Sequence, residues 1–135
     1  MRRITLIILF AVYSAGGSGA WAASPCDGVD RSLPSERKDA LAPVIAKQLS
    51  VARVSVNESM RFGGWSIIYV GTYESDDVFL FYAMDPLTVG PVTMWGGVAL
   101  RSEERTIRIW TIKNAPGIPS KLASCFAWHV TKDRG

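Results

Sequence analysis

The N-terminal segment decides which part of this chain folds and in which compartment. Two arginines near the start precede an apolar run at residues 4–13, and small residues follow as far as Ala23. A basic head, a short apolar run and a small-x-small site are the three parts of a secretory signal peptide. The run is shorter than the roughly 20 residues that a bilayer span needs. We expect cleavage after Ala22, with Ala23 as the close alternative; a retained anchor or a buried helix is the competing interpretation.

Removal of residues 1–22 leaves residues 23–135, which have the length of a single domain. The full sequence has 15 basic and 12 acidic residues and a net charge of +3, and the removed segment contains Arg2, Arg3 and no acid. The exported chain therefore has 13 basic residues against 12 acidic ones and a net charge of +1. Since no run of Lys or Arg remains, we expect no nucleic-acid partner and no stable membrane insertion after cleavage.

Export also changes the chemistry of the two cysteines, Cys26 and Cys125, which lie near the two ends of the exported chain. In an oxidising compartment two lone cysteines pair with each other most simply. In the chain-entropy model, closing a loop of about 100 residues stabilises a fold by about 4 to 5 kcal/mol. We therefore predict a Cys26–Cys125 disulfide.

Two other roles for these cysteines are weaker. A lipoprotein acylation site at Cys26 would need a small residue before it, where the chain has Pro25. A nucleophilic Cys125 beside His129 would need a free sulfur, which a disulfide removes.

Residues 34–49 are predicted to form a helix. Apolar residues follow Leu41 at three, four and eight positions, on one helix face: Val44, Ile45 and Leu49. Pro34 suits the first turn, whereas Pro43 should kink or split the helix.

After position 50 the apolar residues repeat with period two. Segment 53–62 alternates as a half-buried strand does, with Glu58 as the one exception on its apolar side. Gly63-Gly64 joins it to segment 65–70, and a two-glycine loop between apolar runs is typical of a hairpin. Segments 65–70 and 78–84 are apolar on both faces and are predicted to be central strands.

The last third of the chain is more ambiguous. Residues 92–100 are predicted to form a strand, with a bulge fitting at Gly96-Gly97. Residues 102–113 have charges suited to a capped helix, but their β-branched and aromatic residues favour a strand. Residues 125–130 are predicted to form a last strand. These segments together predict an α+β domain, in which an N-terminal helix packs on an antiparallel meander of about four to six strands.

Catalytic and metal-binding patterns are mostly absent. The sequence has one histidine, His129, and lacks the spacings of zinc sites, nucleophile elbows and phosphate-binding glycine loops. We expect no metal and no cofactor. His129 is expected to be a partly buried structural imidazole, with a general base as the alternative. The acidic residues 74–77 are interpreted as a polar turn rather than a cation site.

The most unusual feature is aromatic. Trp65 ends the segment Phe62-Gly63-Gly64-Trp65, and Trp95 precedes a second glycine pair. Trp is enriched at binding surfaces because it offers a large rigid face, and glycine beside it would let a partner approach closely. The alternative is that Trp fills the core. The predicted binding residues are Phe62, Trp65, Trp95 and Trp128.

Three functions remain open. The leading hypothesis is a small periplasmic or secreted, non-enzymatic binding module that acts on an envelope protein or a cell-wall glycan, as an inhibitor or a protective protein. The alternatives are a small hydrolase that uses His129 with a carboxylate, and a structural accessory protein of the envelope.

Overall fold

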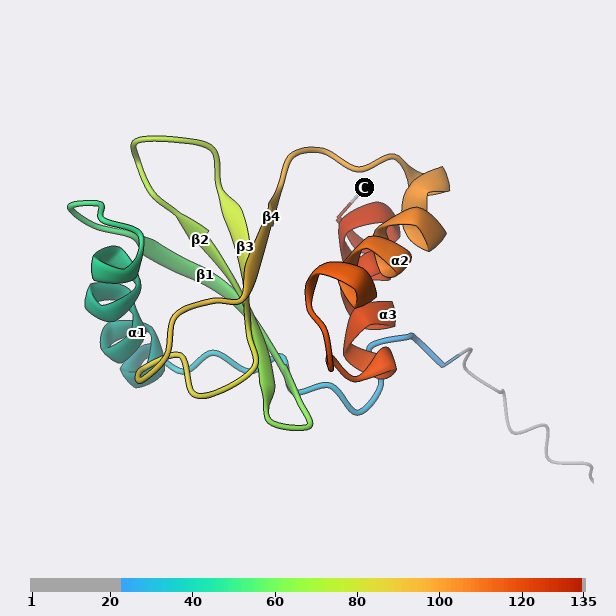
Figure 1. The fold of residues 1–135 in the computed structure, drawn as a ribbon, viewed down its shortest axis with the longest axis horizontal. Coiled ribbons are helices and arrows are strands. Elements are labelled where there is room, and N and C mark those ends of the chain that lie inside the picture. The colour runs from blue at the N-terminus through green and yellow to red at the C-terminus, as the bar shows by residue number, and fades with distance from the viewer. Residues whose placement is uncertain (1–22, 135) are drawn as a thin grey trace, which may run out of the picture.

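The computed structural model describes residues 23–134, so the predicted signal peptide lies outside the described residues. A four-stranded antiparallel sheet lies between one helix on one face and two helices on the other (Figure 1). The α+β class is therefore confirmed. Within residues 23–134, no helix combines the length and the apolar character that a membrane crossing requires.

The sheet is a meander in the order β1-β2-β3-β4. Its strands are β1 (Ser55–Phe62), β2 (Trp65–Gly71), β3 (Val78–Tyr82) and β4 (Thr93–Gly96). Gly63 and Gly64 form the β1–β2 turn with φ values of 58° and 81°, a conformation that glycine adopts without strain. The predicted hairpin is present, and β2 and β3 are the central strands.

A bulge in β1 changes which side of the sheet its residues face. The register with β2 shifts between Val56 and Glu58. Val56 therefore packs with α1 on one side, whereas Met60 packs with the C-terminal helices on the other. The sequence pattern treated these residues as one apolar face with Glu58 as an exception, and the bulge shows why that was wrong.

Helix α1 (Ser35–Gln48) lies over one face of the sheet (Figure 1). Leu41 and Ile45 are fully buried in a cluster with residues of β1, β2 and β3. Pro43 lies inside α1 without splitting it.

The C-terminal third contains helices where strands were predicted. A short 3-10 turn, η1 (Arg101–Glu103), leads into α2 (Glu104–Asn114), α3 (Ser120–Trp128) follows, and a π-helical turn, η2 (His129–Asp133), ends the described chain. Both strand predictions, at 102–113 and 125–130, were wrong.

Tertiary packing explains these helices. In α2, Ile107 and Thr111 are buried one turn apart, while Ile109 and Ile112 face solvent. Burial against the core therefore decides the conformation of these β-branched residues and overrides their β propensity. In α3, the buried residues repeat at helical spacing over a window longer than 125–130: Leu122, Ala123, Phe126 and Ala127.

The predicted Cys26–Cys125 disulfide is present and connects the N-terminal segment to α3. Both residues are buried, and the Cys125 sulfur lies 3.8 Å from the Met60 sulfur of β1. The bridge therefore connects the start of the domain to a helix that covers the sheet.

Loss of this disulfide should destabilise the fold. In a Cys26→Ala/Cys125→Ala variant we expect the free energy of unfolding to fall by about 2 to 5 kcal/mol, because the unfolded chain regains the freedom that the cross-link removes. Urea unfolding of the exported chain, followed by circular dichroism, measures the loss, and reduced wild-type protein is the control. A variant that unfolds at the wild-type urea concentration would contradict this prediction.

Candidate functional site

The four predicted binding residues do not form one surface. Phe62 and Trp65 are paired neighbours at the β1–β2 turn, whereas Trp95 lies on β4 at the opposite edge of the sheet and Trp128 on α3. Trp65 is 9% exposed, and the other three are half-buried against the same core cluster. The structure thus brings together only Phe62 and Trp65.

Phe62 and Trp65 border a surface groove of about 570 Å³ at the β1–β2 turn. We call it the hairpin groove, and it lies where β1 ends, β2 begins and β3 has just ended. The segment Phe62-Gly63-Gly64-Trp65 lines it together with four charged residues, Asp30, Arg37, Arg61 and Asp85. The loop after β3 contributes Met84 and Pro86.

Arg61 is held in the hairpin groove by Asp30. An Nη of Arg61 donates to Asp30 Oδ2 at 2.7 Å, and the backbones of the two residues exchange hydrogen bonds of 2.9 and 2.8 Å. Asp30 also accepts hydrogen bonds from the hydroxyl and backbone N–H of Ser32. These bonds from Ser32, together with Arg61, lower the pKa of Asp30, so its carboxylate is ionised at neutral pH.

Arg37 enters the groove from the first turn of α1 without such a partner. Within residues 23–134, no carboxylate lies within ion-pair distance of its guanidinium. Burial and the neighbouring positive charge of Arg61 lower the pKa of Arg37. In the described chain, the Nε atoms of Arg37 and Arg61 are both buried and have no hydrogen-bond partner.

The loop after β3, which lines the groove, is anchored to α1. The Pro86 carbonyl accepts a 2.8 Å hydrogen bond from the Gln48 side chain of α1, and Gln48 accepts one of 2.7 Å from the Tyr82 hydroxyl. Burial raises the pKa of Tyr82, so its hydroxyl keeps the proton that it donates. The Asp85 carboxylate accepts a bond from the backbone of Leu87 and turns the loop.

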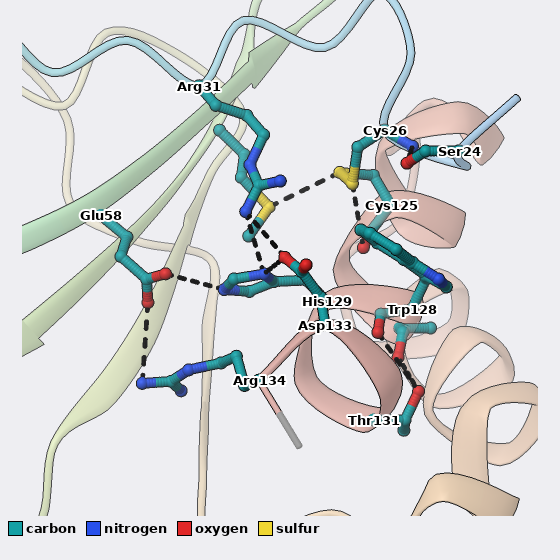
Figure 2. Close-up of polar contacts among 12 residues, drawn as sticks. Ser24, Cys26, Arg31, Glu58, Cys125, Trp128, His129, Thr131, Asp133 and Arg134 are labelled. Carbon is teal, nitrogen blue, oxygen red and sulfur yellow. Dashed lines mark hydrogen bonds and ion pairs between the residues drawn. A yellow bond between two sulfur atoms is a disulfide. The ribbon is translucent and has the colours of Figure 1, made fainter. Parts of the chain in front are cut away.

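A second cluster of charged residues surrounds His129 (Figure 2). His129 is 3% exposed, with Nε2 at 2.8 Å from Glu58 Oε1 and Nδ1 at 2.7 Å from Asp133 Oδ2. Arg31 donates to the same Asp133 oxygen at 3.1 Å, and Arg134 lies 3.7 Å from the other Glu58 oxygen. The β1 bulge explains why Glu58 faces His129.

The imidazole of His129 contacts a carboxylate at each nitrogen. Hydrogen bonds with His129 are the main cause that lowers the pKa of Glu58 and of Asp133, so both are ionised at neutral pH. An Nη of Arg31 also lies 3.0 Å from Nδ1, so both ring nitrogens already have polar partners. A general base needs a free ring nitrogen facing its substrate, and this arrangement leaves none.

The acidic turn at residues 74–77 is the remaining candidate for cation binding. Asp77 of the acidic turn accepts a 3.3 Å hydrogen bond from the Tyr69 hydroxyl, and the turn is exposed. Among residues 23–134, no group of three or more His, Cys, Asp or Glu side chains is arranged to hold a metal ion.

Sequence reasoning identified the turn of the hairpin groove but missed Asp30, Arg37 and Asp85 as its neighbours. All three lie at least 20 residues from the turn in the chain, and their local patterns are those of ordinary solvated charges. No protein-family model, curated protein or solved structure matches this chain. The groove is therefore interpreted from its own geometry.

The cluster around His129 should make stability depend on pH. Because the pKa values of Glu58 and Asp133 are lowered in the folded chain, the unfolded chain binds protons more strongly. This stabilisation is complete above the ordinary pKa values of the two groups, 4.5 for Glu58 and 3.8 for Asp133. It is lost as the pH falls through their lowered pKa values in the folded chain. Urea unfolding measures the free energy of unfolding between about pH 6 and about pH 2. This free energy should fall steeply with pH in the wild type and less steeply in Glu58→Gln/Asp133→Asn.

Asp27 is an exposed carboxylate outside this cluster, so Asp27→Asn is the matched control and should keep the steep loss. A double variant with the wild-type pH slope would show that the cluster does not produce it.

Proposed function

We propose that this protein is a small exported, non-enzymatic binding module that acts on an envelope protein or a cell-wall glycan, as an inhibitor or a protective protein. The observation that carries the proposal is the hairpin groove, an open hollow where two arginines and two aspartates lie beside a glycine turn. Ligands bind preferentially in such hollows, where a few placed polar groups fix their orientation.

The chemistry of the groove supports binding rather than catalysis. Its charged residues are two arginines, which only donate hydrogen bonds, and two aspartates that already accept them. His129, on which the hydrolase alternative depends, does not line this groove. Both of its ring nitrogens face carboxylates.

Export is supported by the disulfide, because such bridges persist mainly in oxidising compartments. We therefore propose a periplasmic or secreted location after cleavage of residues 1–22. The intact mass of the exported protein should correspond to a chain that begins at Ala23 or Ser24. A mass that includes residues 1–22 would refute this location.

Filling the hairpin groove should weaken partner binding. Met84 is exposed and lines the groove, whereas Leu87 is exposed nearby and does not, so Met84→Trp and Leu87→Trp form a matched pair. Each immobilised protein is incubated with envelope proteins and with purified cell wall from the producing organism. We expect wild type and Leu87→Trp to retain a defined component, and Met84→Trp to retain about tenfold less.

Equal retention by Met84→Trp, or none by the wild type, would refute the proposed function. If the protein has a purely structural role in the envelope, which is the remaining alternative, filling the groove should not change its function. Thermal unfolding of both variants confirms that each is folded.

A further inference from the structure

The charges of this chain are divided unevenly between its two halves. Residues 98–134, which contain η1, α2, α3 and η2, have seven basic and three acidic residues and a net charge of +4, with His129 counted as neutral. Residues 23–97, with α1 and the sheet, have six basic and nine acidic residues and a net charge of −3. The near-neutral exported chain is therefore polarised, and the helices opposite α1 are its cationic side (Figure 1).

Within this cationic side, the exposed charges of α2 and of the turn before it have one sign. The exposed charged residues between positions 101 and 113 are all basic: Arg101, Arg105, Arg108 and Lys113. The two acids of this segment are half-buried. Glu103 accepts a 2.7 Å hydrogen bond from the Leu100 backbone, and Glu104 pairs with Lys132. The outward side of α2 is therefore positive.

Two large apolar side chains lie among these cations. Ile109 and Ile112 are 53% and 47% exposed. Each lies four positions after an arginine of the same helix, so the two pairs share one helix face. Folding does not require isoleucine there, because both positions lie outside the core and β-branched residues are weaker helix formers than Ala, Lys or Glu. The four exposed cations and these two isoleucines are called the α2 face below.

Helix α1, which covers the other side of the sheet, has an ordinary solvated surface. Its exposed charged residues balance each other: Glu36, Lys38, Asp39 and Lys47. Within α1, no large apolar side chain is exposed. Exposed cations without exposed acids, together with exposed isoleucines, therefore distinguish α2 from α1.

This combination favours an anionic lipid surface over other anionic partners. Lys and Arg are attracted to acidic headgroups, and each one near the surface strengthens binding about fivefold. Aliphatic side chains beside them enter the boundary between headgroups and acyl chains. A soluble polyanion would contact the cations but leave the isoleucines in water. A basic helix face that also carries apolar residues is therefore typical of binding at a membrane surface.

We propose that the α2 face docks this protein on an anionic phospholipid bilayer. The contact is peripheral and reversible, because two half-exposed isoleucines bury too little apolar area for stable insertion. It weakens as salt increases, since its cations stay near water. No residue of the α2 face lines the hairpin groove, so docking and the proposed binding function use separate surfaces.

Co-sedimentation of the exported chain with lipid vesicles tests the proposal. One set of vesicles is phosphatidylcholine, and the other is equal parts of phosphatidylcholine and phosphatidylglycerol. At low salt we expect binding to the anionic vesicles to be at least about tenfold tighter than to the neutral ones. At high salt this difference should disappear.

Two variants test the contribution of charge. Arg105→Gln/Arg108→Gln removes two cations from the α2 face and should weaken binding to the anionic vesicles at least about tenfold. Lys38→Gln/Lys47→Gln removes the same charge from the exposed surface of α1. It is the matched control and should bind as the wild type does.

Two further variants test the apolar contact. Ile109→Gln/Ile112→Gln keeps the charge and places better helix formers on the surface, so it should stay folded and bind the anionic vesicles at least about fivefold more weakly. Leu87→Gln/Val89→Gln changes two exposed apolar residues of the loop after β3 and should bind as the wild type does. Circular dichroism confirms that each variant is folded.

Equal binding to the two sets of vesicles, or an unchanged affinity in either α2 variant, would overturn the proposal. Tighter binding to dextran sulfate than to the anionic vesicles would also overturn it and assign the α2 face to a soluble anionic polymer. Retention of an envelope component is measured separately with Met84→Trp, so either proposal can fail while the other stands.

Discussion

The central strands of this protein are apolar on both faces, and the rest of the fold follows from that constraint. In β2 and β3, alternate side chains belong to two separate buried clusters, one on each side of the sheet. Because a single helix can cover only one face, a second layer has to cover the other. Helix α1 supplies the first layer, and α2 with α3 supplies the second (Figure 1). Strand β4, at the edge, is short and only half-buried.

Much of this architecture could be predicted from the sequence, and the errors have one physical origin. Helix α1, the glycine hairpin, the two central strands and the disulfide were all evident from local patterns or from the count of cysteines. The helical state of α2 and α3 was not, because it is set by contact with Phe79 and Phe81 of β3, far away in the chain. Strands that are apolar on both faces need a second layer to bury the face that α1 does not cover. This requirement predicted the C-terminal helices better than the β propensity of single residues did.

The two charged clusters differ in how far the sequence near each residue predicts its role. Glu58 interrupts an apolar pattern, and this interruption was the visible sign of the β1 bulge that turns it toward His129. Arg37 carries no such sign, since a charged residue in the first turn of a helix is ordinary. Folding places Arg37 near Arg61, and no feature of the sequence around Arg37 predicts this neighbour.

The N-terminal segment contacts α3, the turn η2 and the strand β1. Cys26 is bonded to α3 and Arg31 reaches η2 (Figure 2). Asp30 pairs with β1. The chain is made from its N-terminus, so Cys26 and Arg31 wait for Cys125 and Asp133 until nearly all of it has been synthesised. Until then, the apolar face of β2 and β3 opposite α1 stays uncovered, and such surfaces promote aggregation. The face of the sheet that α2 and α3 cover is therefore the last part of this fold to close.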